Sequence, residues 1–84
     1  MKAFLVDKIF KAMRGMESST SKLDVLASDK RTTEFLNIEY NIGKYHAYMD
    51  CLKIIDIDKW AELHTRFEVE IKNAMVKIEQ IYNK

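Results

Sequence analysis

Residues 33–55 carry two separate apolar stripes when they are placed on a helix that turns about 100° per residue. The first stripe contains the large side chains Phe35, Ile38, Ile42, Tyr45, Met49 and Leu52. The second lies on nearly the opposite side and contains Leu36, Tyr40, Gly43, Ala47, Cys51 and Ile54. Because a helix with two opposed apolar faces buries both against other helices, we expect this segment to be the middle of a helical sandwich.

The last segment of the chain has apolar positions alternately four and three residues apart, as in an antiparallel helix pair or a coiled coil. These positions are Trp60, His64, Phe67, Ile71, Ala74, Ile78 and Ile81. We expect them to pack on the large-residue stripe of 33–55, which gives a long antiparallel helical hairpin. Asp56 predicts the break between the two helices, because aspartate is a good N-cap and a poor mid-helix residue. One continuous helix is the alternative, since the stripes stay nearly in phase across Asp56.

The N-terminal segment predicts a first amphipathic helix with a broad apolar arc. The arc contains Leu5, Val6, Ile9, Phe10, Ala12, Met13 and Met16. Gly15 and the polar run 17–21 are expected to end this helix, because glycine favours helix C-termini and Ser and Thr favour turns. The predicted elements are a helix over about 2–15, a connector over 16–30, and helices over about 31–55 and 57–82, all in one domain spanning 1–84.

The composition supports an all-α fold. The chain has 84 residues, 48% of them hydrophobic, with no Pro and two Gly. We expect an all-α three-helix unit that self-associates as a dimer, because so short a chain leaves apolar surface uncovered. Val69 and Val76 add to this surface, since they lie on the back of the last helix. The candidate interface residues are Gly43, Ala47, Cys51, Leu36, Tyr40, Val69 and Val76.

Small residues recur one turn apart at Gly43, Ala47 and Cys51, which lets another helix approach closely. Glycine inside a helix costs about 1 kcal/mol relative to alanine, so a close contact is expected to compensate for it. Two occupants of this groove remain open at this point. One is the first helix, with Phe10 and Met13 as knobs, and the other is a second subunit.

The sequence gives little basis for catalysis. His46, Asp50 and His64 are the one potential metal constellation, and we interpret them as structural because a fourth ligand is missing. Cys51 is expected to be a small apolar filler, since it has no histidine at helical spacing on its own face. Phosphate-binding loops and nucleophile elbows are absent from the sequence. We therefore expect no enzyme activity, no metal and no cofactor.

The formal net charge of +1 favours no particular class of charged partner. The single cysteine fits a reducing cytoplasm, and Asp7 and Lys8 interrupt the only apolar run near the N-terminus, so we expect a cytoplasmic protein without a membrane span. The predicted function is a protein-protein interaction module or small regulator that binds a partner protein or itself. The alternative is a nucleic-acid-binding regulator that uses the basic N-terminal third.

The segment Thr20-Ser21-Lys22-Leu23-Asp24-Val25-Leu26 is similar to a signature of the small helical-hairpin aspartyl-phosphate phosphatases of sporulating bacteria. That signature reads Ser-Gln-Glu-Leu-Asp-x-Leu-Ile. The similarity rests on Leu23, Asp24 and Leu26, and the serine and glutamine of the signature are lacking. It implies a helical phosphatase as a third interpretation.

Overall fold

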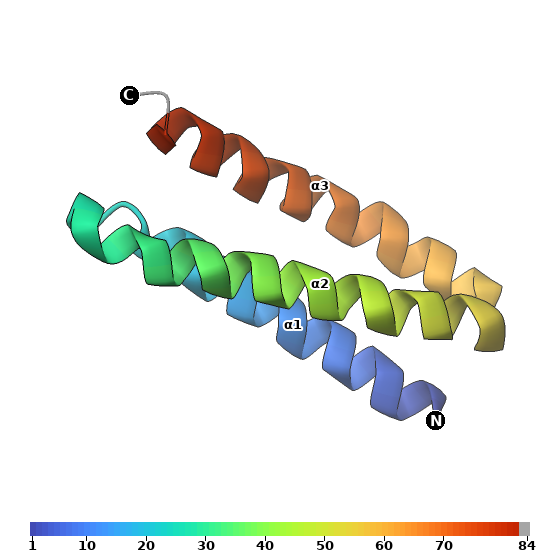
Figure 1. The fold of residues 1–84 in the computed structure, drawn as a ribbon. Helices are drawn as coiled ribbons and strands as arrows, with labels where there is room; N and C mark the ends of the chain where they lie inside the picture. Colours follow the sequence, from blue (N-terminus) through green and yellow to red (C-terminus); the bar gives the residue numbers. More distant parts are fainter. Residues whose placement is uncertain (83–84) are drawn as a thin grey trace.

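The structure, a computed structural model that describes residues 1–82, is an elongated unit of three long helices. Helix α1 spans Lys2–Lys22, α2 spans Arg31–Ile55 and α3 spans Ile57–Tyr82, with a short 3-10 turn, η1, at Ser28–Lys30. The chain runs up, down and up again, so that α2 is antiparallel to both of its neighbours (Figure 1). The prediction of an all-α three-helix unit built on a hairpin is confirmed.

Asp56 is the single residue that separates α2 from α3. Its backbone is extended, with φ −153° and ψ 92°, and its carboxylate Oδ1 accepts a hydrogen bond of 3.1 Å from the backbone N–H of Lys59. This is the bond an N-cap makes to the third residue of a helix. The alternative of one continuous helix is wrong, because the chain reverses direction at this residue (Figure 1).

Helix α1 continues to Lys22, well past the end predicted at Gly15, so the connector covers residues 23–30. The hydroxyls in the polar run bond back to the helix, with Thr20 Oγ1 donating to the Met16 carbonyl at 2.7 Å. Met16, Ser19 and Leu23 are buried, so packing against α2 outweighs the preference of this run for turns. The Arg31 Nε atom donates to the Leu23 carbonyl at 3.2 Å and joins the two ends of the connector.

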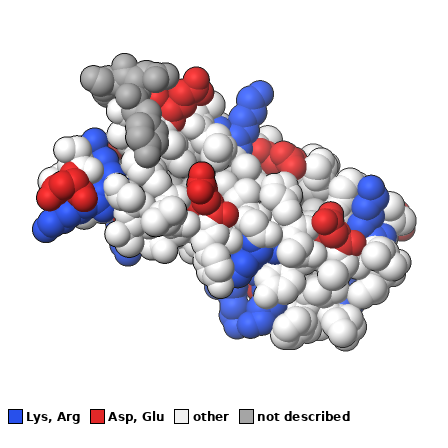
Figure 2. All heavy atoms as spheres, in the orientation of Figure 1, with Lys and Arg blue, Asp and Glu red and all other residues white. Residues whose placement is uncertain are grey.

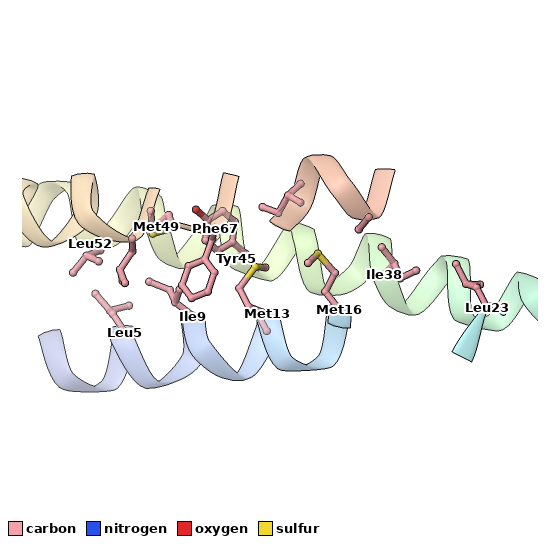
Figure 3. Packing of buried hydrophobic residues seen from close by; sticks show 14 residues of the cluster. Leu5, Ile9, Met13, Met16, Leu23, Ile38, Tyr45, Met49, Leu52 and Phe67 are labelled. Carbon is pink, nitrogen blue, oxygen red and sulfur yellow. The ribbon is translucent and has the colours of Figure 1, made fainter. Parts of the chain in front are cut away.

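The hydrophobic core lies where the three helices meet. Phe67 of α3 points between α1 and α2 (Figure 3), with its ring centroid 5.2 Å from that of Phe10 and 6.0 Å from that of Tyr45. Every residue predicted at the hairpin core is either buried in this cluster or packs against it partly buried. Leu63 is also buried, at 2% exposure, although the spacing had favoured its neighbour His64.

The order of layers differs from the predicted sandwich. Helices α1 and α3 both pack against the large-residue stripe of α2, and Leu5, Ile9 and Met13 of α1 face Tyr45, Met49 and Leu52 (Figure 3). The prediction that this stripe belongs to α3 alone is therefore wrong. Helix α1 also lies closer along α2 than α3 does. One face of α2 consequently carries the whole core.

Candidate functional site

The opposite face of α2 is uncovered. We call it the outer face of α2 and define it by Leu36, Tyr40, Gly43, Ala47, Cys51 and Ile54, all of which are exposed. Leu36 is 61% exposed, Tyr40 65% and Ile54 87%. The face follows the helix for about 27 Å, at 1.5 Å per residue from Leu36 to Ile54. An exposed apolar stripe of this length on a helix is typical of an interaction surface.

Gly43 lies at the middle of the outer face, and no helix of the same chain approaches it. A β-carbon at this position would have no other atom within 4 Å beyond its own backbone surroundings. The possibility that α1 fills the groove of small residues is therefore wrong. The close approach of α1 to α2 occurs on the core side instead, where a β-carbon on Gly15 would lie 2.8 Å from the Asn41 side chain.

The remaining candidate interface residues do not join the outer face of α2. Val69 and Val76 are exposed on the outer side of α3, which points away from the core in a different direction.

Cys51, within the outer face of α2, is exposed, so its predicted role as a buried filler is wrong. Charged side chains flank the outer face, with Asp50 and Glu39 along one edge and Lys44 along the other.

The histidines have separate partners and do not converge on a common site. His64 Nδ1 lies 3.5 Å from Glu68 Oε1, and its ring stacks on Trp60 at 4.7 Å between centroids. His46 packs edge-on against Tyr45 at 5.3 Å. Within residues 1–82, no three His, Cys, Asp or Glu side chains are close enough together to hold a metal ion.

Comparison with known proteins gives no assignment. No protein-family model, curated protein or solved structure matches the chain significantly.

The basic residues of the N-terminal third are spread among acidic ones. Lys2 Nζ lies 2.6 Å from Asp56 Oδ2, and Lys11 Nζ lies 3.0 Å from Asp7 Oδ2. Basic and acidic side chains are interspersed on the face drawn in Figure 2. The arrangement therefore provides no continuous basic surface on that face for a phosphate backbone. None of the helices in the described residues is long and apolar enough to span a bilayer.

A groove of about 320 Å³ lies between the C-terminal halves of α1 and α3, and the sequence gave no indication of it. Its lining consists of Met16, Glu17, Thr20, Ser21, Glu70, Asn73, Ala74 and Lys77. Burial raises the pKa of Glu70, and a hydrogen bond with Glu17 and the charge of Glu17 raise it further. Two carboxyl groups can share a hydrogen bond only when one is protonated, so this pair is a pH-sensitive contact between α1 and α3.

Tyr45 is the most deeply buried titratable side chain of the core. Burial, with a smaller contribution from the charge of Glu68, raises the pKa of Tyr45 to about 12. The hydroxyl therefore stays neutral at physiological pH, and the ring packs against Phe67.

Proposed function

We propose that this chain is a small non-catalytic helical interaction module that binds another helix through the outer face of α2. The observation that carries the proposal is the exposure of Leu36, Tyr40 and Ile54 on one side of a helix whose other side holds the whole core. Apolar side chains aligned along a helix commonly bind an amphipathic partner helix. The partner is another protein or a second copy of the chain.

The outer face also has the shape that a partner helix requires. Gly43 and Ala47 carry little or no side chain at the centre, and Leu36 and Ile54 supply larger contacts toward the two ends. Small central residues let two helix axes come close, and the larger terminal side chains then pack around the partner. This supports a helix lying along α2 rather than a small molecule, since the groove between α1 and α3 is separate from this face.

Site-specific photo-crosslinking tests this proposal. A photoreactive phenylalanine analogue is placed at Ala47, on the outer face, and in a control at Thr65, which is exposed on α3. After irradiation in the producing cells, we expect a discrete protein adduct from position 47 and none from position 65. A probe at Tyr40 should give the same adduct, and adding Ala47→Glu to that chain should abolish it. Adducts from position 65 with none from position 47 would contradict the proposal.

A further inference from the structure

We infer that the helix covering the outer face of α2 belongs to a different protein and carries basic residues beside its apolar stripe, where they face Glu39 and Asp50. This inference rests on the proposed function, because it names the partner of the same site. Its evidence is the charge along the two edges of the outer face and the positions of the nearest cations of the chain itself.

One edge of the outer face carries two exposed carboxylates. Glu39 and Asp50 lie eleven residues apart on this edge, which is three helical turns and about 16 Å along the axis. Lys53, on the same side of α2, reaches the Trp60 ring, so this edge is the one nearer to α3. A helix seated on the apolar stripe brings its own flanking residues against these carboxylates, as at the e and g positions of a coiled coil.

Neither carboxylate has a charged partner in its own chain. Within residues 1–82, the ion pairs of the structure include neither Glu39 nor Asp50. Glu39 has no Lys or Arg three or four residues away on its helix. Asp50 has Lys53 three residues further on, but Lys53 Nζ lies 4.7 Å from the centroid of the Trp60 ring. Both carboxylates are therefore available to cations that a partner supplies.

A second copy of the chain would not supply cations to both. An antiparallel two-fold pair sets each edge against the same edge of the other copy, so Glu39 and Asp50 would face carboxylates. A parallel pair sets the acidic edge against the opposite edge, where Lys44 is the one basic residue of α2. Lys44 lies six residues, or about 9 Å, from the level of Asp50. Its Nζ already lies 4.6 Å from the centroid of the Tyr40 ring.

The outer face therefore specifies the chemistry of its partner. An apolar stripe about 27 Å long accommodates an amphipathic helix of about eighteen residues. Two lysines or arginines on one edge of that helix, about three turns apart, would meet Glu39 and Asp50 together. Flanking charges of this kind set which partner a helix selects, because the wrong charges are repelled.

Two synthetic amphipathic peptides of about twenty residues test this charge preference. Both carry the same leucine stripe, and the positions that flank the stripe are lysine in one peptide and glutamate in the other. In fluorescence anisotropy at low salt, the wild-type chain should bind the lysine peptide at least about tenfold more tightly, because attraction replaces repulsion at both carboxylates. Glu39→Lys combined with Asp50→Lys should reverse the preference. Glu39→Gln combined with Asp50→Asn should remove it.

The matched control is Glu62→Lys combined with Glu79→Lys, which makes the same change of net charge at exposed positions of α3. This chain should keep the preference for the lysine peptide, which separates a local contact from a general attraction between charged molecules. Ala47→Glu should weaken the binding of both peptides, because it places a large charged side chain at the centre of the outer face. Circular dichroism verifies that each variant is folded.

The natural partner is tested by the photo-crosslink from position 47. The adduct should be lost with Glu39→Lys/Asp50→Lys and kept with Glu62→Lys/Glu79→Lys. An adduct that survives the first pair of substitutions would overturn the inference, as would equal binding of the two peptides or binding of neither. So would a wild-type dimer, seen in sedimentation equilibrium, that Ala47→Glu dissociates. An adduct or a dimer that depends on Ala47 would still leave the proposed function intact, and the absence of both would remove it as well.

Discussion

Gly15 of α1 lies directly against Asn41 of α2, where a β-carbon would come within 2.8 Å of both terminal atoms of the Asn41 amide. The amide is held in place, because Asn41 Nδ2 donates to the Asn37 carbonyl at 2.9 Å. A larger residue at position 15 would require the Asn41 side chain to move. Gly43 lies on the opposite face of α2, and a β-carbon there would contact no other part of its own chain.

The two glycines should therefore respond differently to alanine. In an Ala47→Glu background that prevents association through the outer face, Gly43→Ala should stabilise the chain by about 1 kcal/mol, through helix propensity alone. Gly15→Ala should gain less or destabilise, because the Asn41 amide must move. Asn41→Ala should restore the gain at position 15. Urea unfolding compares the Ala47→Glu background with the Gly43→Ala, Gly15→Ala and Gly15→Ala/Asn41→Ala chains made in it. Equal effects of alanine at the two glycines would show that Gly15 is not in a tight contact.

Leu63 and His64 test the packing of α3. The side chain of Leu63 is buried, whereas that of His64 is 44% exposed. Leu63→Ala should lower the free energy of unfolding by about 2–5 kcal/mol, through lost burial and the cavity that remains. His64→Ala is the neighbouring control and should change it by less than about 0.5 kcal/mol. The reverse order in chemical denaturation would mean that α3 is rotated by about one residue.

Asp56 caps α3 and also forms an ion pair with Lys2, and the pH dependence of stability reports on its charged form. The Lys2 ammonium, which bonds to the carboxylate, and the Lys59 backbone N–H hold the pKa of Asp56 below its ordinary value. Its contribution to stability is therefore present above an ordinary pKa of 3.8 and is lost as the pH falls through the lowered value.

Thermal unfolding of Asp56 variants should follow from this. At pH 7 the melting temperature should decrease in the order wild type, Asp56→Asn, Asp56→Ala, since asparagine keeps the cap and loses only the ion pair. Lys2→Met should resemble Asp56→Asn. As the pH falls through the lowered pKa of Asp56 and the aspartate becomes neutral, the wild type and Asp56→Asn should converge. A difference between them that does not depend on pH would exclude the ion pair as its cause.

The contribution of Glu70 to stability depends on pH in the opposite direction to that of Asp56. Its raised pKa means that the folded chain holds a proton that the unfolded chain releases, starting from an ordinary pKa of 4.5. Stability therefore falls as the pH rises from that value through the raised one. Glu70→Gln removes the titration and can still donate to Glu17, so its melting temperature relative to wild type should increase between pH 4 and pH 8. Glu79→Gln, exposed on the same helix, should show no such trend.

Several features of the fold follow from local sequence. Apolar spacing identifies which side of α1 and of α3 is buried, as Ile9, Phe67 and Ile71 illustrate. The capping chemistry of Asp56 predicts the reversal between α2 and α3, because aspartate satisfies the first free N–H groups of a helix better than it continues one. The two stripes of α2 are also evident from its sequence. Each of these depends only on residues within a few turns of one another.

Tertiary structure decided which stripe of α2 is covered. Hydrophobic burial is non-directional, so the periodicity of α2 favours neither stripe as the site for α1. The choice depends on contacts between distant residues: Gly15 against Asn41, and Phe67 against both Phe10 and Tyr45. Burial of Met16, Ser19 and Leu23 in the same way extends α1 through its polar run to Lys22. The sequence by itself determined that α2 has two apolar faces, and only packing left Leu36, Tyr40 and Ile54 exposed for a partner.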